Sequence, residues 1–332
     1  MNRVFDKTRV REYLNYLGVK KNYKFKINSC ENCGNKNNKI IRERIHIGKN
    51  KNSQNIFCYF PFFLCDNCNL LFQKYKFEKK FYSDYYKIIY RKRTYKSTRP
   101  NKLQLRDIKK RGEYLLKFIE KKFNNKKGKI LDVGCSVGGM LKAFKEKDWD
   151  CVGIDPHKEW VDFGKKYYDL NLLSIDAENM NFKPNSLDVI MIIGSLEHVY
   201  DPNIVLKKCY KFLKKEGLLI LEGRGNPIGH SMMFFNHNHH RIYSINTFKT
   251  FANKHGFKHI YSTDKVKITG PVNKGGTKAE KAISYIGKKN EIPDKKKHNK
   301  YIKSLRYNFK IHKKKFDDRD KVCSLKNAII LN

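Results

Sequence analysis

Apolar and polar residues follow two alternating patterns along most of this chain. Short runs of consecutive apolar residues have the length of buried strands, and apolar residues at helical spacing fill the segments between them. The strand-like runs lie at residues 130–133, 151–156, 172–178, 186–193, 217–222, 256–261 and 282–287. Strands that alternate with helices favour a mostly parallel α/β sheet with helices on both faces, and we expect its last strand to be antiparallel.

Three segments have the pattern of helices that pack on such a sheet. Residues 101–123 repeat apolar residues at helical spacing and end in a segment rich in Asn and Gly. Residues 201–213 and 244–255 have the same spacing. The chain from residue 288 onward is dense in lysine and has few apolar residues, so we expect a basic helix or a partly disordered tail there.

A glycine-rich turn follows the first predicted strand. Gly134, Gly138 and Gly139 come directly after it, and a helical pattern follows them. This strand–turn–helix sequence lets backbone amides and a helix N-terminus approach a polar ligand. Asp132 precedes the turn, and Asp155 ends the second strand at the spacing of a carboxylate that holds a nucleoside ribose. An ordinary strand-to-helix turn of an α/β protein is the alternative.

The residue at position 136 helps to decide which of two kinds of nucleoside cofactor the turn could bind. A dinucleotide site needs a glycine there, where the backbone contacts the pyrophosphate, but this chain has Ser136. The segment instead resembles the first motif of the class I S-adenosylmethionine-dependent methyltransferases, with Ser136 in place of that motif's middle glycine. Residues 151–156, 172–178 and 186–202 resemble the family's next motifs in the same order.

This resemblance implies a Rossmann-like, seven-stranded sheet that binds S-adenosylmethionine at one edge. It implies that Gly134 forms the tight turn, that Gly138 leaves room near the methionine end of the cofactor and that Asp155 accepts both ribose hydroxyls. Asp176 and Ala177 would lie beside the adenine. The expected cofactor-binding residues are Asp132, Gly134, Cys135, Ser136, Gly138, Gly139, Asp155, Pro156, Asp176, Ala177, Gly194 and Ser195.

The chain is strongly basic, with 72 Lys and Arg against 32 Asp and Glu and a formal net charge of +40 over 332 residues. Such a charge is common in proteins that bind nucleic acid or anionic membranes. However, lysine far outnumbers arginine, and abundant Asn, Ile, Tyr and Phe are typical of AT-rich coding sequence. We therefore favour base composition as the origin of the charge. Nucleic-acid binding and a phosphorylated substrate remain alternatives.

Four of the nine cysteines form two pairs with the spacing of metal ligands. Two residues separate Cys30 from Cys33, and two separate Cys65 from Cys68, so both thiolates of a pair can reach one ion. A Gly or Asn follows each pair and tolerates the unusual backbone turn. We predict a closed structural zinc site with no open coordination position. A redox pair or free thiols are the alternatives.

No apolar run reaches bilayer length and no signal peptide is evident, so we expect a soluble, cytoplasmic protein.

The cysteine pairs narrow the family resemblance. Strands predicted at residues 39–47 and 56–64 complete a zinc ribbon, and a tyrosine-rich segment at residues 81–86 follows. This order resembles bacterial methyltransferases with an N-terminal zinc-binding domain, which include sugar C-methyltransferases that act on nucleotide-linked deoxysugars and relatives in surface-polysaccharide synthesis. We predict an N-terminal extension (1–27), a zinc ribbon (28–75), a helical linker (76–128), a methyltransferase domain (129–287) and a basic tail (288–332).

Candidate catalytic residues follow the fourth and fifth predicted strands. Methyl transfer to oxygen or carbon requires an aligned acceptor and removal of its proton. Glu197 and His198 follow the fourth strand, and a histidine-rich segment at residues 234–244 follows the fifth, where we expect a loop that faces the acceptor. We take His237 and His239 from that segment as further candidates, with a hydrogen-bonded structural role as the alternative for each.

The histidine-rich segment departs from the closest family pattern. It aligns with a sugar C-methyltransferase segment, but Asn236 and Asn238 stand where that family has Tyr and Glu. Because an Asn cannot act as a general base, O- or N-methylation assisted by His239 is at least as plausible as C-methylation. A metal site made of His237, His239 and His240 is a further alternative.

Three functions compete. The first is methylation of a small molecule, a nucleotide-linked sugar or surface-glycan precursor, by in-line displacement. The second is an RNA or DNA methyltransferase, but the chain has neither the Asn/Asp-Pro-Pro-aromatic loop that holds a base amine nor a Pro-Cys pair. The third is a non-catalytic zinc-ribbon binding protein, which the intact glycine turn and Asp155 disfavour. We predict the first function.

Overall fold

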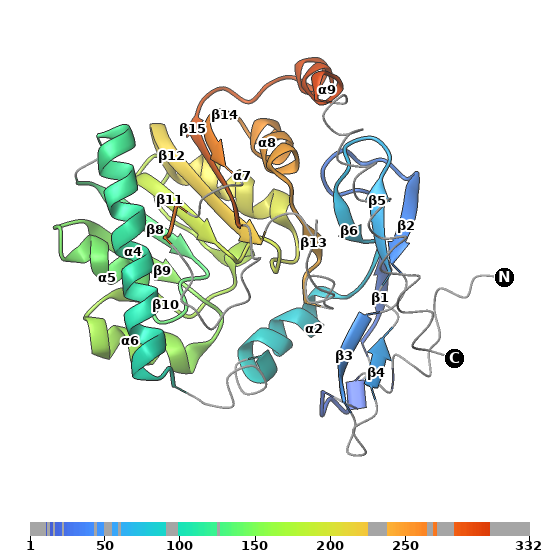
Figure 1. The fold of residues 1–332 in the computed structure, drawn as a ribbon, viewed down its shortest axis with the longest axis horizontal. Helices are drawn as coiled ribbons and strands as arrows, with labels where there is room; N and C mark the ends of the chain where they lie inside the picture. The colour runs from blue at the N-terminus through green and yellow to red at the C-terminus, as the bar shows by residue number, and fades with distance from the viewer. Residues whose placement is uncertain are drawn as a thin grey trace.

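A seven-stranded sheet forms the centre of the molecule (Figure 1). The computed structural model describes residues 11, 14–15, 17–21, 23–42, 45–49, 55–58, 61–90, 99–124, 127–224, 238–263, 268–270 and 282–305. From edge to edge the sheet contains β10 (Asn171–Leu173), β9 (Asp150–Ile154), β8 (Lys129–Val133), β11 (Leu187–Ile193), β12 (Leu213–Arg224), β15 (Ala282–Lys289) and β14 (Phe257–Thr263).

The strand directions confirm the predicted mixed sheet. The strands from β10 to β12 are parallel, whereas β15 is antiparallel to both of its neighbours. The chain runs outward from β8 through β9 to β10 and then returns to place β11 on the other side of β8. A ligand site of an open α/β sheet lies where the strand order reverses in this way, beyond the carboxyl ends of the strands.

Helices cover both faces of the sheet, as the apolar runs predict (Figure 1). One face packs on α4 (Lys102–Phe123), α5 (Gly139–Lys145) and α6 (Lys158–Tyr168), and the other packs on α7 (Pro202–Phe212) and α8 (Ile245–Lys254). Neighbouring strand residues alternate between the two layers. Ile130 and Val189 face α4 to α6, whereas Leu131 and Ile190 face α7 and α8. Strands buried on both faces must be apolar throughout, which is why they form continuous apolar runs.

Local signals set the ends of the longest helix, α4. The Asn101 side chain accepts a hydrogen bond from the backbone of Gln104, and the Gln104 side chain accepts one from the backbone of Asn101. This reciprocal cap satisfies two amides that the first turn leaves unpaired. At the other end Asn124 adopts the left-handed conformation, with φ 55°, that ends many helices.

The N-terminal part forms small antiparallel sheets beside the large one. The four-stranded sheet contains β13 (Arg241–Ile242), β6 (Leu71–Gln73), β5 (Phe62–Cys65) and β2 (Asn38–Arg42). The two-stranded sheets pair β1 (Phe25–Ile27) with β7 (Tyr75–Phe77) and β3 (Ile45–Lys49) with β4 (Asn55–Cys58). β2 and β3 overlap the strand predicted at residues 39–47, and β4 and β5 overlap the strand predicted at residues 56–64. Register shifts in both ladders interrupt the regular pairing.

The histidine-rich segment differs from its expected form as a loop. Two of its residues form β13, which pairs with β6 and so adds a strand to the cysteine-containing sheet. After β7 the chain forms α2 (Lys79–Asp84) and the π-helix η1 (Tyr85–Ile89), which lead towards α4. The short helix η2 (Ala177–Asn179) follows β10.

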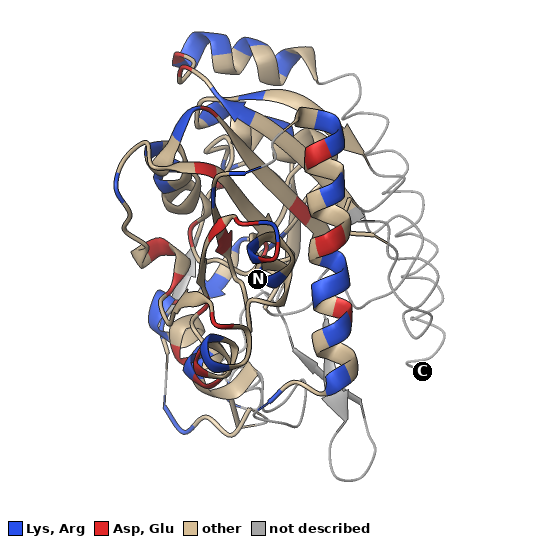
Figure 2. Cartoon of the chain, turned by 90° about the vertical axis from the view of Figure 1, so that its left-hand side faces the viewer, with Lys and Arg blue, Asp and Glu red and all other residues tan. Residues whose placement is uncertain are grey.

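The lysine-rich region after β15 contains the helix α9 (Lys295–Ser304), in which Ile302 is buried. Figure 2 shows Lys and Arg on many elements, including α4 and α9, rather than on one continuous face. In the part of the chain that the structure describes, no helix combines the length and the apolar character that a membrane span requires.

Candidate functional site

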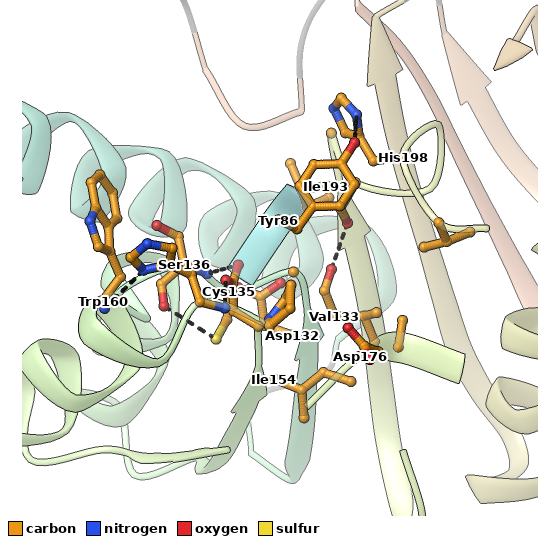
Figure 3. A pocket seen from close by; sticks show the side chains of 18 of the residues that line it. Tyr86, Asp132, Val133, Cys135, Ser136, Ile154, Trp160, Asp176, Ile193 and His198 are labelled. Atoms are coloured by element: carbon orange, nitrogen blue, oxygen red, sulfur yellow. Dashed lines mark hydrogen bonds between the residues drawn. The ribbon is translucent and has the colours of Figure 1, made fainter. Parts of the chain in front are cut away.

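A cavity of about 610 Å³ lies beyond the carboxyl ends of β8, β9 and β11. The tyrosine-rich helices α2 and η1 and one side of α4 close it from outside the sheet. Of the predicted cofactor-binding residues, the ones that line this cavity are Asp132, Gly134, Cys135, Ser136, Asp155, Pro156, Asp176, Ala177, Gly194 and Ser195. Several of them converge on the cavity in Figure 3.

The turn after β8 has the backbone conformation that its glycines predict. Gly134 has φ 86°, and its amide donates to the carbonyl oxygen of Ile154 at 2.8 Å. A Cβ atom at this position would lie 2.6 Å from Cβ of Ser195, so only glycine fits. Ser136 also has a positive φ, 57°, which is unfavourable for a residue with a side chain. The chain therefore keeps the backbone of a glycine turn despite the Ser at its centre.

Gly138 and Gly139 do not line the cavity, which differs from the expected role of Gly138. A Cβ atom at Gly138 would lie 2.9 Å from a methyl group of Leu170, and one at Gly139 would lie 2.7 Å from Ile108. These two glycines therefore let α5 pack closely on its neighbours at the start of the helix.

Asp155 directly follows β9 and is buried, with 6% of its surface exposed, and backbone amides hold its carboxylate in place. Its Oδ2 accepts a hydrogen bond from the Ser136 amide at 3.0 Å, and its Oδ1 accepts one from the His157 amide at 3.0 Å. Each carboxylate oxygen has a second lone pair, so both oxygens can also accept from a hydroxyl. This arrangement fits a ribose with two adjacent hydroxyl groups.

Asp132 lies next to Asp155 and titrates differently from an ordinary aspartate. Burial, together with the charge of Asp155, raises the pKa of Asp132 to about 7. Two buried carboxylates at one cavity favour a ligand that carries positive charge, and S-adenosylmethionine has a sulfonium and an ammonium group. The donor set thus fits this cofactor.

Asp132 should make the stability of the ligand-free protein depend on pH. The unfolded side chain titrates near 3.8 and the folded one near 7, so the folded state binds more protons between these values. The free energy of unfolding therefore falls by up to about 1.4 kcal/mol per pH unit across this range. We expect Asp132→Asn to stabilise the protein more at pH 8 than at pH 5 in urea titrations. An equal effect at both values would contradict the shifted pKa.

The far end of the cavity, near η2, holds Asp176 and Ala177, where the adenine is expected. Oδ2 of Asp176 accepts a hydrogen bond from Oγ of Ser83 at 3.2 Å and lies 3.5 Å from Nζ of Lys87. Helices α2 and η1 thus cover this end of the cavity. The tyrosine-rich segment both packs in a core and lines the cavity. Phe81 and Tyr85 pack in a core cluster, while other residues line the cavity.

His198 faces the cavity next to Tyr86, as Figure 3 shows. Nδ1 of His198 lies 2.9 Å from the Tyr86 hydroxyl and 2.9 Å from the carbonyl oxygen of Asn238. The hydroxyl also donates to that carbonyl at 3.1 Å. A carbonyl can only accept, so this geometry favours a hydrogen on Nδ1 and leaves Nε2 as the basic nitrogen. Sequence reasoning missed Tyr86, although the tyrosine-rich segment was the available signal.

The other predicted catalytic residues either do not line the cavity or lie outside the described residues. Glu197 and His239 are 5% and 6% exposed and do not line the cavity. The rings of His198 and His239 lie 4.7 Å apart. His240 is buried against Tyr82, and burial lowers its pKa well below the usual value, so it stays neutral. His237 belongs to the undescribed residues, and the histidine metal site that would include it stays an untested alternative.

The four paired cysteines meet in one cluster. Cys30 and Cys68 have their sulfur atoms 3.5 Å apart, as do Cys33 and Cys65, and all four ligand atoms lie within 4.8 Å of one another. The residue after each pair has the predicted left-handed turn, with φ 74° at Gly34 and 55° at the corresponding Asn. Among the described residues this is the cluster of His, Cys, Asp and Glu able to hold a metal ion. Four thiolates fit a closed tetrahedral zinc site.

Sequence comparison finds that the part of the chain that forms this cavity is similar to known methyltransferases. Residues 131–221 match the model of the family described as "Methyltransferase domain". The chain is 32% identical over 115 residues to a ubiquinone biosynthesis O-methyltransferase of Actinobacillus pleuropneumoniae, a match that covers 31% of this chain and 49% of that protein. It is 31% identical over 122 residues to a tRNA U34 carboxymethyltransferase of Sulfurimonas denitrificans, covering 35% and 41% respectively. The match thus spans about half the length of these curated relatives or less.

A solved structure is similar as well. One chain of the complex between the Haloferax volcanii Trm112 methyltransferase activator and a methyltransferase aligns with a TM-score of 0.47 and 15% identity, over 57% of this chain and 95% of that chain. The family match begins in β8 and ends in β12, so it contains the glycine turn, Asp155 and the loop with His198. The part of this chain from β8 to β12 is therefore similar to the methyltransferase domain family.

Proposed function

We propose that this protein transfers a methyl group from S-adenosylmethionine to an oxygen of a small molecule, a nucleotide-linked sugar or surface-glycan precursor. The observation that carries the proposal is that one cavity contains both the Asp132–Asp155 pair and the His198–Tyr86 pair. The first pair fits the cofactor, and the second offers a base for the acceptor. The name of the ubiquinone O-methyltransferase relative also supports transfer to oxygen.

The cofactor supplies a methyl group on a sulfonium, and the residues of this chain align the acceptor and remove its proton. Asp155 fixes the ribose end, and the turn at Gly134 lets the backbone approach the cofactor closely. His198 takes the acceptor proton on Nε2, because Nδ1 is engaged by Tyr86 and a backbone carbonyl. Tyr86 holds the imidazole in place.

The rim of the cavity supports an anionic acceptor. Lys79, Lys110 and Arg111 line its outer side, on α2 and α4. Arg111 is partly held by Glu222, whose Oε1 lies 3.4 Å from the guanidinium. A diphosphate attached to a sugar would place negative charge at these cations while the sugar reaches His198. We also propose the five regions predicted from the sequence, from the N-terminal extension and zinc ribbon to the methyltransferase domain and basic tail.

A nucleic acid is the second candidate acceptor. The name of the tRNA-modifying relative and the net charge of +40 favour it. The decisive experiment is a methyl-transfer assay with labelled cofactor across nucleotide-sugars, glycans, phenols and RNA. Transfer to a nucleotide-sugar supports the proposal, transfer to RNA alone replaces it with the second candidate, and no transfer to any acceptor contradicts both.

Removing the base should separate binding from catalysis. We expect His198→Gln to lower the rate of methyl transfer by about 100-fold or more, because proton removal by a positioned base contributes at least that much. Tyr86→Phe should lose about tenfold, since the imidazole keeps its carbonyl partner. Calorimetric affinity for the cofactor should change less than about twofold in either variant.

The control for these variants is His259→Gln, which changes an exposed histidine on β14 that contacts Ser262. This variant should keep the full rate. A rate in His198→Gln equal to that of His259→Gln would exclude His198 as the base.

A further inference from the structure

The side chain of Glu31 connects the cysteine cluster to the large sheet. Glu31 lies between Cys30 and Cys33, and its side chain is 12% exposed. Its Oε2 accepts a hydrogen bond from Nε of Arg241 at 2.6 Å. Its Oε1 accepts from Nη2 of Arg241 at 3.0 Å and from Nζ of Lys76 at 2.6 Å. Both cationic side chains are buried, with 0% and 4% exposed.

These two cations also bind the backbone of the loop that follows β11. Nη1 of Arg241 donates to the carbonyl oxygens of Leu196 at 2.9 Å and Val199 at 2.7 Å. Nη2 of Arg241 and Nζ of Lys76 both donate to the carbonyl oxygen of Tyr200, at 3.2 and 2.8 Å. Three carbonyls within five residues are thus fixed by two cations that both pair with the Glu31 carboxylate. Figure 1 shows β13, which begins with Arg241, between β6 and the large sheet.

We propose that Glu31 is a positioning residue for methyl transfer, because through its two cations it fixes the loop that carries His198. This inference rests on the proposed function only where it assigns His198 to the reaction. A metal ion held by Cys30 and Cys33 fixes the backbone on both sides of Glu31, in a turn closed by the bond from the Gly34 amide to the Cys30 carbonyl at 2.7 Å. The metal content of the cysteine cluster is therefore coupled to the geometry of the active site.

The second cysteine pair provides a matched comparison. Asp66 occupies the same place between Cys65 and Cys68 that Glu31 occupies in the first pair, but its side chain is exposed. Both acids stand next to metal-ligand cysteines in turns of the same kind. A change at Asp66 therefore tests for a general effect on the cluster, and a change at Glu31 tests for the connection to the loop.

Hydrogen exchange measured by mass spectrometry tests the coupling without an acceptor. In the zinc-loaded protein, Glu31→Gln should raise the exchange rate of the peptide at residues 194–203 by about tenfold or more, because a buried cation loses its carboxylate partner. The peptide over β9 should not change, and neither peptide should change in Asp66→Asn. An unchanged rate at residues 194–203 in Glu31→Gln would overturn the inference.

Two further measurements keep the test decisive. The double variant Glu31→Gln with Lys76→Met keeps the net charge of the buried cluster, so it should fold even where the single variant does not. It should show the same increase in exchange. Removal of zinc from the native protein by a chelator should also raise exchange at residues 194–203, and a loop that stays protected would contradict the coupling.

Methyl transfer then separates this inference from the proposed function. Glu31→Gln should lower kcat by about tenfold while calorimetric affinity for S-adenosylmethionine stays within about twofold, because the loop positions the base rather than the ribose. A native protein that transfers no methyl group would contradict the proposed function, and the exchange rates alone would still decide the role of Glu31. A normal kcat together with raised exchange would overturn the positioning role.

Discussion

Replacing Asp155 by alanine should abolish measurable binding of S-adenosylmethionine, with an expected loss of affinity of about 100-fold or more. The carboxylate would accept hydrogen bonds from both ribose hydroxyls, and each bond to a charged group contributes about 1.5–3 kcal/mol. The variant also removes the acceptor of the Ser136 amide, so the glycine turn loses one of its fixed contacts. Isothermal titration calorimetry measures the affinity, and circular dichroism checks that the fold is retained.

The same strand offers a control for this variant. Asp150 begins β9 at the opposite end of the sheet, where its side chain is 61% exposed and pairs with Lys129 at 2.7 Å. Asp150→Asn removes a negative charge from β9 without reaching the cavity, and it should leave cofactor affinity unchanged. Equal affinities in Asp155→Ala and the native protein would show that the cofactor binds elsewhere.

Loss of one cluster thiolate should remove the metal and unfold the N-terminal sheets. We expect the purified protein to hold about one zinc ion per chain, and Cys65→Ser to lose it. Structural zinc sites contribute on the order of 10 kcal/mol to small domains, more than the short strands of this region can replace. Inductively coupled plasma mass spectrometry gives the metal content, and hydrogen exchange of β5 and β6 reports the local fold.

A cysteine outside the cluster serves as the comparison. Cys151 is buried in β9, and its sulfur contacts the carbonyl oxygens of Leu141 and Trp149. Cys151→Ser keeps a donor of similar size there and should retain the zinc. A fully folded protein without metal would rule out the structural zinc site and favour free thiols.

The sheet and the cofactor half of the site were predictable because their signals are local. β8 and β11 are buried on both faces and so appear as continuous apolar runs. The turn at Gly134 and the acid at Asp155 each follow directly from the strand before them. Even the departure at Ser136 was visible, and what the sequence did not show is that the backbone there keeps a positive φ.

The acceptor half was harder to predict because its contacts join distant residues. Tyr86 and His198 are 112 positions apart, and no pattern within either segment indicates their hydrogen bond. β13 is two residues long, too short for any periodicity, so its pairing with β6 left no signal. For the same reason, the histidine-rich segment was expected to be a loop that presents His239 to the acceptor.

The partnership of Glu31 and Arg241 also has a consequence for the order of folding during synthesis. The two residues are 210 positions apart, so both cysteine pairs leave the ribosome long before Arg241 is made. Until then β6 is an open edge strand, and the Glu31 carboxylate pairs with Lys76 but lacks Arg241. We expect amides of residues 196–200 to be among the last protected in pulse-labelled refolding, because they wait for this distant contact. A nascent chain stalled before β13 would therefore be the form of this protein most exposed to aggregation.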